Sequence, residues 1–550
     1  MQNIILKIHP EDNILVALRD LEAGQVLNWQ NHQVRLLEAI PAKHKFAAVD
    51  FAEGAPVMLY GILVGKATRP IPKGSRIRTE NVTHATQDIK VDRSPLRWVA
   101  PSTTPFAGRH FLGYHRSDGR VGTMNHWLVI PLVFCENRNI EIIKSSMLTQ
   151  LGYLHERDFA VDVQQLVQLY SDGASEAAIR QANILKTTSN SQEQQLFPHV
   201  DGIQFLTHDG GCGGIRQDSE TLCRLLAGYI THPNVAGATV LSLGCQNAQI
   251  PLLEQAIREQ NPNFDKPLFI LEQQQSQSER QFIAEAVQQT FIGLMRANKI
   301  ERRPAPLHQL TIGLECGGSD GFSGISANPV LGQVSDLLVA LGGTTILAEF
   351  PELNGVEQEL ISRCTTKALA QKFMQLMNSY AERAAAVGSG FDKNPSPGNI
   401  KDGLITDAMK SAGAARKGGS SPIQDVLDYT EVVKQRGLNL LCTPGNDVES
   451  TTGLAASGAN IILFTTGLGT PTGNPITPVI KVSSNSALAQ RMPDIIDFDT
   501  GPIITGETTI EERALALLDY LIKVASGEQR PAAVRLGQYD FIPWKRGISL

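Results

Sequence analysis

Three cysteines lie in loops that are rich in glycine and polar residues: Cys212, Cys245 and Cys316. The loops span residues 207–214, 244–247 and 315–321. Thiolates are soft ligands that suit iron ions and iron–sulfur clusters, and glycine neighbours let a ligand approach the backbone closely. Three thiolates around a cluster would leave one iron open to a substrate. The alternative is that each cysteine is a small buried apolar side chain, and the sequence leaves both interpretations open.

Two other residues of these loops have the chemistry of proton transfer. His208 lies four residues before Cys212, and an imidazole exchanges protons near neutral pH. We predict that His208 is a catalytic base, with a metal ligand or an exposed loop histidine as the alternatives. Asp320 lies in the loop of Cys316, and we predict that it is catalytic or binds metal, although aspartate is also common in plain turns.

A further set of residues is predicted to hold the carboxylate and hydroxyl groups of a substrate. These residues are His115, Arg116, Ser319, Asn446 and Lys481. Arginine is suited to this role because its guanidinium group grips a carboxylate with two hydrogen bonds. The alternative for the charged residues of the set is an exposed, solvated position.

Short apolar runs precede most of these loops, as the strands of an α/β sheet would. One series of runs lies at 203–206, 238–243 and 268–271, and a second at 310–314, 344–347, 438–441 and 461–464. Apolar residues at helical spacing lie between runs, for example at 282–294. Because ligands bind at the carboxyl ends of strands in open α/β sheets, polar loops at successive strand ends predict one shared site.

The chain is predicted to divide into three units. Residues 1–90 form a small all-β domain with glycine turns at Gly24, Gly54 and Gly74, and the proline-containing segment 91–105 is a linker. Residues 106–303 and 304–550 form two α/β domains with mainly parallel sheets.

Composition excludes several classes of protein. The 550 residues carry a net charge of −6, with 42% hydrophobic and 19% charged residues, which is typical of a folded globular protein and gives no basic surplus for nucleic acid. No apolar run approaches a membrane span, and residues 1–7 lack the layout of a signal peptide. Seven cysteines without a CxxC pair favour a reducing cytoplasm over a disulfide framework.

Several long motifs resemble the altronate and galactarate dehydratases, bacterial enzymes that remove water from sugar acids. The motifs lie at 40–46, 60–65, 113–125, 394–399 and 444–447, together with the three cysteine loops. The resemblance covers almost the whole chain and is closer to the altronate branch, on residues 438–470 and 496–499. It implies that residues 1–90 are a SAF domain, a β-clip unit, and that the protein is an iron-dependent hydro-lyase.

One departure from the family concerns a metal site in the SAF domain. Family members usually carry a His-x-His-Asn stretch at the end of that domain, but here the residues are Arg78-Thr79-Glu80-Asn81. A metal site in this domain would therefore have to use Glu80 and His44, and we expect His44 to be a metal ligand.

The resemblance implies a demanding reaction: removal of a weakly acidic proton beside a carboxylate and loss of hydroxide from the next carbon. Such a reaction needs a base, an acid and a positive centre. We expect D-altronate to be converted to 2-dehydro-3-deoxy-D-gluconate, in hexuronate catabolism, with Fe(II) or Mn(II) as cofactor, or a cluster on Cys212, Cys245 and Cys316. The alternatives are galactarate or another aldonic or aldaric acid, a different leaving group such as sulfite, or a noncatalytic sugar-acid sensor.

A nucleotide-binding enzyme is disfavoured because no GxxxxGK[ST] sequence and no helix-opening GxGxxG followed by an acid is present. We expect a homodimer that lies in the cytoplasm and binds a small sugar acid as its substrate. We expect it to bind neither nucleic acid nor a membrane.

Overall fold

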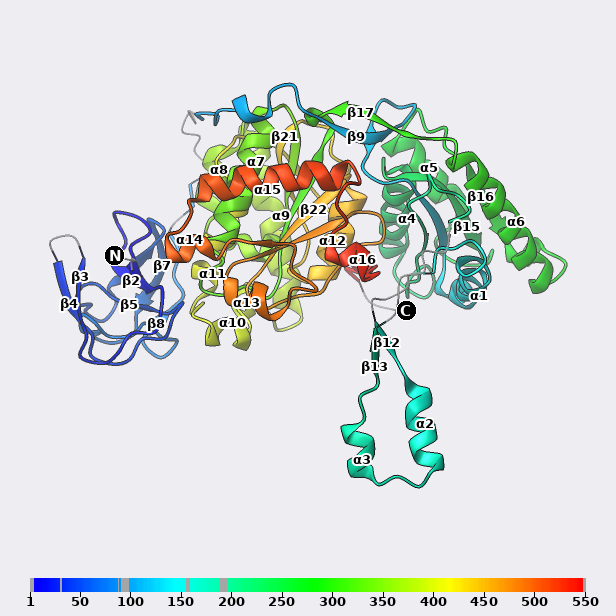
Figure 1. Cartoon of the computed structure of the whole chain (residues 1–550). Helices are drawn as coiled ribbons and strands as arrows, with labels where there is room; N and C mark the ends of the chain where they lie inside the picture. Colours follow the sequence, from blue (N-terminus) through cyan, green and yellow to red (C-terminus); the bar gives the residue numbers. More distant parts are fainter. Residues whose placement is uncertain are drawn as a thin grey trace.

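A computed structural model describes residues 4–29, 32–87, 89–90, 98–154, 159–187 and 195–547 of the chain. Figure 1 shows three units side by side: a small β unit at the N-terminus, a large central-to-C-terminal α/β unit, and a second α/β unit built from residues in the middle of the sequence. This architecture confirms the predicted fold class.

The N-terminal unit is made of short antiparallel strands. These are β1 (Ile5–Leu6), β2 (Ile14–Ala17), β3 (Val26–Trp29), β4 (His32–Arg35), β5 (Lys45–Ala47), β6 (Pro56–Leu59), β7 (Ile62–Ala67) and β8 (Val82–Thr83). They form the sheets β1-β2-β5, β3-β4 and β6-β7-β8. The predicted turn glycines Gly24, Gly54 and Gly74 all have positive φ, at 78°, 77° and 83°, a region that favours residues without a Cβ atom.

The middle unit holds a parallel sheet in the order β14-β11-β15-β16. Its strands are β11 (His126–Pro131), β14 (Gly202–Phe205), β15 (Val235–Ser242) and β16 (Leu268–Glu272). Alternate residues of β11 face opposite ways: Trp127 and Val129 pack with helices α1 (Asn137–Leu148) and α6 (Glu279–Ala297), whereas Leu128 and Ile130 pack with α4 (Arg216–Thr231) and α5 (Ile250–Gln260). The sheet is therefore covered on both faces, as in doubly wound folds.

Two smaller features flank this middle unit. Strand β9 (His110–His115) pairs with β10 (Val121–Gly122) and with β17 (Arg302–Pro306), so the start and the end of the unit lie together. An arm projects away from the molecule in Figure 1. It consists of β12 (Phe159–Val161), α2 (Val163–Ser171), α3 (Glu176–Gln181) and β13 (Leu185–Thr187).

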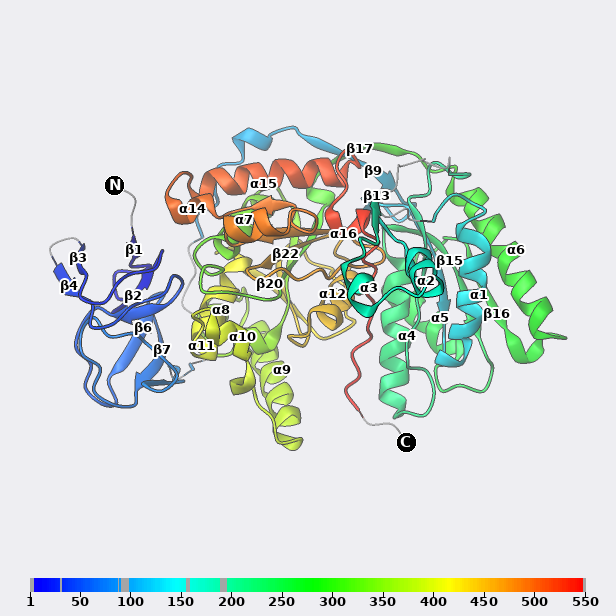
Figure 2. The same ribbon diagram turned by 60° about the horizontal axis from the view of Figure 1, so that its bottom comes forward.

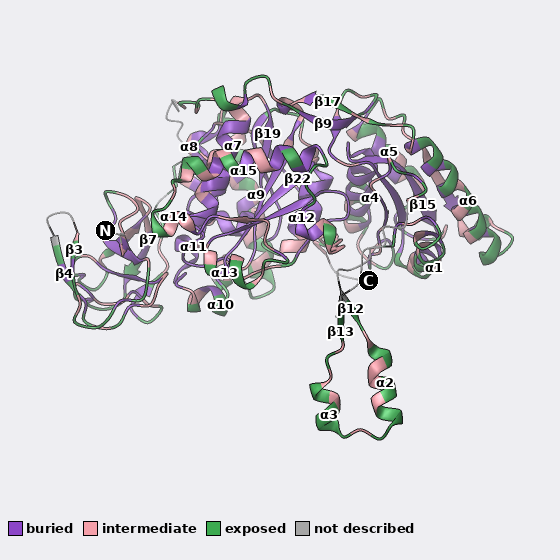
Figure 3. Cartoon of the chain, viewed as in Figure 1, coloured by how far each residue is buried: buried purple, intermediate pink, exposed green. Residues whose placement is uncertain are grey.

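The C-terminal unit is built around a seven-stranded sheet in the order β20-β21-β19-β18-β22-β23-β24, in which all neighbouring pairs are parallel. The strands are β18 (Thr311–Cys316), β19 (Thr344–Leu347), β20 (Ile423–Leu427), β21 (Gly437–Leu441), β22 (Ile461–Thr466), β23 (Val479–Ser483) and β24 (Phe498–Asp499). The four strands predicted for this unit are confirmed. Figure 3 shows that this sheet is buried almost throughout, in contrast to the exposed arm.

Helices cover both faces of the C-terminal sheet. Helices α7 (Ala327–Ala340) and α15 (Ile510–Ala525) pack on one face, and α12 (Asp447–Ala456) and α16 (Ala532–Arg535) on the other. The remaining helices are α8 (Glu357–Arg363), α9 (Lys367–Ala386), α10 (Pro397–Lys401), α11 (Asp407–Ala414), α13 (Ser486–Arg491) and α14 (Pro502–Thr505). Across the described ranges, no helix is both long and apolar enough for a membrane crossing.

The chain after α16 joins the two α/β units. Figure 2 shows this segment running between the C-terminal unit and α4. Arg546 forms an ion pair with Asp428 of the C-terminal unit at 2.6 Å, and its backbone N–H donates to Asp218 of α4 at 3.1 Å. The carboxyl edges of both sheets therefore face a common region of the molecule.

Candidate active site

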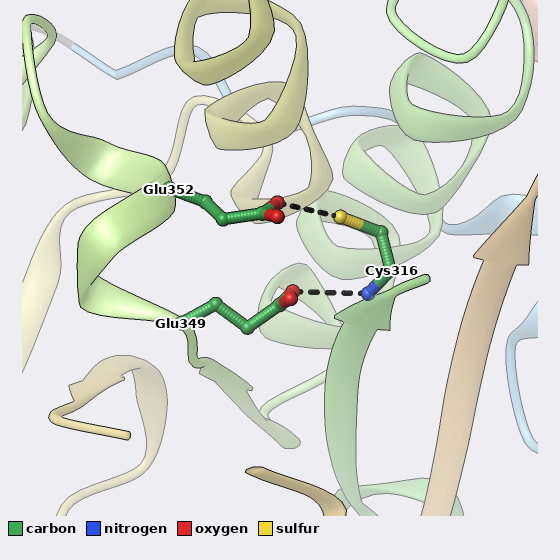
Figure 4. Close-up of side chains that lie close together, drawn as sticks. All are labelled: Cys316, Glu349 and Glu352. Carbon is green, nitrogen blue, oxygen red and sulfur yellow. Dashed lines mark hydrogen bonds between the residues drawn. The ribbon is translucent and has the colours of Figure 1, made fainter. Parts of the chain in front are cut away.

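A buried group of one thiol and two carboxylates lies at the carboxyl edge of the C-terminal sheet. Cys316 is the last residue of β18, and Glu349 and Glu352 follow β19, its neighbour in the sheet. The Cys316 thiol donates a hydrogen bond to Glu352 Oε2 at 2.9 Å, and the Cys316 backbone N–H donates to Glu349 Oε2 at 3.0 Å (Figure 4). The ligand atoms of all three side chains lie within 4.8 Å of one another.

Glu349 begins the short helical turn Phe350–Leu353, which carries Glu352. Glu349 has a left-handed conformation, with φ of 66°, which is unfavourable for a residue with a side chain and persists only where the surroundings enforce it. Its backbone N–H donates to Thr443 Oγ1 at 2.8 Å, and its side chain is fully buried. Such local strain is common at functional sites.

Two lysines compensate the negative charge of this group. Lys417 Nζ lies 2.5 Å from Glu349 Oε2, with both side chains almost inaccessible to solvent. Lys410 Nζ lies 2.6 Å from Glu352 Oε1 and also donates to Asn394 Oδ1 at 2.6 Å. Buried charges require such partners because desolvation is costly.

Burial and the close spacing of these ionisable side chains shift their pKa values. Burial, followed by the charges of Glu349 and Glu352, raises the pKa of Cys316 well above its usual value. Burial and the charge of Glu352 also raise the pKa of Glu349, although Lys417 opposes them. Burial alone would raise the pKa of Glu352, but Lys410 and Lys417 outweigh it and bring that pKa to about 2. Burial favours neutral Lys417, yet the surrounding acids raise its pKa well above the usual value, so it stays protonated.

A further carboxyl group, that of Asp447, adjoins this group. Asp447 opens α12, directly after the loop that follows β21. It lies so close to Gly317 that a Cβ atom there would be 2.2 Å from Asp447 Oδ2, which explains the glycine after Cys316. Burial and the charges of Glu349 and Glu352 raise the pKa of Asp447 to about 7. Asp447 is therefore able to exchange a proton near neutral pH.

Asp320, predicted to be catalytic, connects the N-terminal unit to the C-terminal unit. Its buried carboxylate accepts hydrogen bonds from Ser323 Oγ and Ser484 Oγ at 2.9 and 2.8 Å and forms an ion pair with Lys43 at 3.0 Å. The neighbouring Ser319 accepts a hydrogen bond on its backbone oxygen from Asn399 Nδ2 at 2.7 Å. These contacts hold the loop and the N-terminal unit in place.

His44, predicted to be a metal ligand, belongs to the same junction and lies outside the Cys316 group. Its Nε2 is 3.0 Å from the backbone oxygen of Lys401, and Arg76 donates to its Nδ1 at 2.9 Å. Burial and the nearby charge of Arg76 lower the pKa of His44 to about 4. Since a metal needs a ring nitrogen lone pair, these contacts leave His44 poorly placed to bind one.

Three of the predicted site residues lie instead at the carboxyl edge of the middle sheet. The buried His208 ring lies 2.8 Å from the backbone oxygen of Pro131 through Nε2 and accepts from the Gly210 N–H through Nδ1 at 3.1 Å. Burial lowers its pKa, so the ring is neutral and fastens its own loop. Cys212 and Cys245 are exposed free thiols. Within the described ranges, the compact group around Cys316 contains neither of them.

The remaining predicted substrate-binding residues are dispersed. His115 Nε2 lies 3.1 Å from the backbone oxygen of Pro304, and Arg116 Nε donates to that of Pro233 at 2.7 Å. Lys481 is buried on β23, where it donates to the backbone oxygen of Thr472 and lies over the Phe464 ring.

Of that predicted set, Asn446 lies nearest to the Cys316 group. It caps α12 by accepting from the Val448 N–H at 3.2 Å, and it is exposed directly before Asp447 in the sequence.

Sequence reasoning missed five residues of the group: Glu349, Glu352, Lys410, Lys417 and Asp447. Glu349 and Asp447 could have been predicted from their place after a strand of the parallel sheet, where ligands bind. Glu349 lies two residues beyond the end of β19, and Asp447 lies six residues beyond the end of β21. The lysines carried no such signal, since they lie in α11 and in the turn that follows it.

Comparisons with known proteins identify relatives along the whole chain. Residues 3–85 match the altronate/galactarate dehydratase SAF domain, residues 113–298 the second domain of D-galactarate dehydratase/altronate hydrolase, and residues 307–549 the D-galactarate/altronate dehydratase C-terminal domain. The chain is 34% identical to altronate dehydratase of Escherichia coli (strain K12) and 33% identical to that of Bacillus subtilis (strain 168), each over 525 residues and 95% of both chains. Galactarate dehydratase (L-threo-forming) of Escherichia coli (strain K12) is 29% identical over 542 residues, covering 97% of this chain and 95% of the relative. The chain therefore belongs to the D-galactarate/altronate dehydratase family.

Proposed function

We propose that this protein removes water from D-altronate to give 2-dehydro-3-deoxy-D-gluconate. The observation that carries the proposal is the buried group of Cys316, Glu349 and Glu352 with its two lysines, at the sheet edge where α/β enzymes bind ligands. Altronate is favoured over galactarate because identity to the altronate dehydratases, 34% and 33%, exceeds the 29% to the galactarate enzyme.

The same group fits a divalent metal ion, and we propose Fe(II) or Mn(II). Thiolate suits iron and carboxylate suits both ions, and Glu349 Oε1 is buried without a hydrogen-bond partner among the residues described. Such an uncompensated oxygen is costly unless something binds it. Cys316, Glu349 and Glu352 would hold the ion, which supplies positive charge where the substrate becomes an ene-diolate and loses hydroxide.

The surrounding side chains perform the rest of the chemistry in this proposal. Lys410 and Lys417 stay protonated and add fixed positive charge in a site shielded from water, where electrostatic stabilisation is strongest. Asp447, with a pKa of about 7, takes the proton next to the substrate carboxylate, in place of His208. It is suited to this step because it is partly exposed, whereas Glu349 and Glu352 are buried and paired.

The test is a panel of aldonic and aldaric acids, offered to the protein with Fe(II) or Mn(II) under reducing conditions. We expect a 2-keto acid from D-altronate and less from galactarate. Cys316→Ala should abolish the product and reduce bound metal, whereas Cys364→Ala, a buried cysteine of the same unit that lies outside the group, should retain both. No keto acid from any member of the panel would favour a noncatalytic sugar-acid sensor.

We also propose a cytoplasmic homodimer that uses the projecting arm. Helix α2 has no buried residue, and its apolar Val163, Val167 and Tyr170 recur at helical spacing with 58%, 58% and 78% exposure. Two short helices without a core of their own need a partner surface, and a second copy is the simplest one. Light scattering should give twice the chain mass, and Val167→Asp with Tyr170→Asp should give the monomer; a monomeric wild type would contradict this proposal.

A further inference from the structure

Three exposed cysteines lie on three adjoining loops of the middle unit, outside the Cys316 group. Cys135 follows β11 in the turn Phe134–Glu136, Cys212 follows β14, and Cys245 follows β15. Strands β14 and β15 flank β11 on either side in the parallel sheet. All three loops therefore leave the sheet at its carboxyl edge, where α/β proteins place ligands.

Backbone hydrogen bonds join these loops directly. The Phe134 N–H donates to the Gly210 oxygen at 3.1 Å, and the Asn247 N–H donates to the Gly211 oxygen at 2.9 Å. Gly211 has a φ of 96°, and a Cβ atom there would lie 2.1 Å from the Leu132 oxygen. The loop that carries Cys212 thus crosses the end of β11 and touches the loops that carry the other two cysteines.

We propose that Cys135, Cys212 and Cys245 bind an iron–sulfur cluster. All three are free thiols and exposed, and Gln274 Nε2 donates to Cys245 Sγ at 3.3 Å, a contact of the kind that stabilises thiolate and tunes cluster potentials. Cys212 also lines a cavity together with Gly210, Gly214, Tyr429 and Trp544, so the space beside its thiol is open.

A cluster fits these thiols better than a single ion does. The ligands of one zinc or iron ion converge on a point at about 2.3 Å each. Within the described residues, these cysteines form no group whose ligand atoms all lie within 4.8 Å. A cluster is held at its corners, so its sulfur ligands lie further apart. With three protein thiolates, a [4Fe–4S] cluster keeps one iron free for another ligand.

This site replaces one member of the cysteine set predicted from sequence. Cys316 lies in the other sheet, in a group with Glu349 and Glu352, whereas Cys135 lies in a loop that is hydrogen-bonded to the loop of Cys212. The cluster would therefore be separate from the ion proposed at Cys316.

The experiment uses the full chain, purified without oxygen and incubated with ferrous iron, sulfide and a thiol reductant. We expect about four iron and four acid-labile sulfide per chain beyond any iron at Cys316, with the visible absorption of a cluster. Cys135→Ser, Cys212→Ser and Cys245→Ser should each lose most of the sulfide. Cys223→Ser, a buried cysteine in α4 of the same unit, should keep it.

Two further readouts separate this proposal from that of the dehydratase site. Because the three thiols are exposed, their serine variants should melt at the same temperature as the wild type when all are prepared without the cluster, which excludes misfolding as the cause of the lost sulfide. Glu349→Gln should bind the cluster normally even if it is inactive. Iron bound without labile sulfide, a disulfide between any two of the three, or full sulfide in the triple serine variant would each overturn the proposal.

Discussion

Replacing Lys417 with methionine tests whether the carboxylates at Cys316 depend on buried charge compensation. Lys417 and Glu349 are 2.5 Å apart and almost fully buried. Removing one partner of a buried ion pair costs about 3–5 kcal/mol, because the other charge stays buried without compensation. For a unit of roughly 250 residues, each kcal/mol shifts the melting temperature by about 2–4 °C. Lys417→Met should therefore lower the melting temperature of the metal-free protein by roughly 10 °C.

The stability that Lys417→Met loses should increase as the pH rises. The pKa of Glu349 is already raised in the folded protein, and losing Lys417 raises it further. A carboxyl whose folded pKa lies above its unfolded value destabilises the fold increasingly as pH rises toward the folded pKa. The loss should thus be larger at about pH 8 than at about pH 5.5. Adding Mn(II) should recover part of it, since the ion replaces the missing positive charge.

Calorimetry in the presence and absence of a chelator measures both effects. The matched control is Lys372→Met, whose ion pair with Glu431 at 2.8 Å is 38% and 43% exposed and should contribute less than about 1 kcal/mol. Glu349→Gln combined with Lys417→Met should recover much of the loss. If Lys417→Met and Lys372→Met had the same melting temperature at both pH values, the claim that Lys417 compensates the buried charge of Glu349 would be refuted.

Two other variants probe single features of the structure. The pKa of Asp447 is raised from 3.8 to about 7, so the wild type should lose stability between these pH values, by up to about 4 kcal/mol. Asp447→Asn should lack this loss of stability. If the melting temperatures of the wild type and of Asp447→Asn changed in parallel with pH, the raised pKa of Asp447 would be contradicted. Lys43→Met removes the ion pair with buried Asp320 and should weaken docking of the N-terminal unit by about 1–3 kcal/mol. Small-angle scattering should then show a more extended molecule, and an unchanged profile would refute that role.

The sequence predicted the fold well because parallel strands leave strong local signals. The runs 310–314, 344–347, 438–441 and 461–464 are continuous apolar segments, and all four became strands of one sheet. The arm at 159–187 was not predicted, because its short helices resemble ordinary surface helices in composition. Strand β11 was also missed, although it lies between β14 and β15 in the middle sheet.

The site was predicted only where residue type and strand position coincided. Cys316 was found because it ends a strand in a glycine loop, whereas Glu349 was missed because Phe350 and Pro351 follow it instead of glycines. Lys417 could not be distinguished from a surface lysine without knowing its burial. His44 has the chemistry of a ligand, and only the fold shows that Arg76 and Lys401 engage its ring.

The most direct measurement is the rate at which Fe(II)-loaded Glu349→Gln forms keto acid from D-altronate, compared with the wild type under the same reducing conditions. Glu349 accepts a hydrogen bond from the Cys316 backbone N–H and pairs with Lys417, and its Oε1 has no hydrogen-bond partner among the residues that the structure describes. We predict turnover by the wild type and at least about a 100-fold lower rate in the variant, together with weaker iron binding. Wild-type turnover and iron content in Glu349→Gln would contradict the assignment of this group as the catalytic centre.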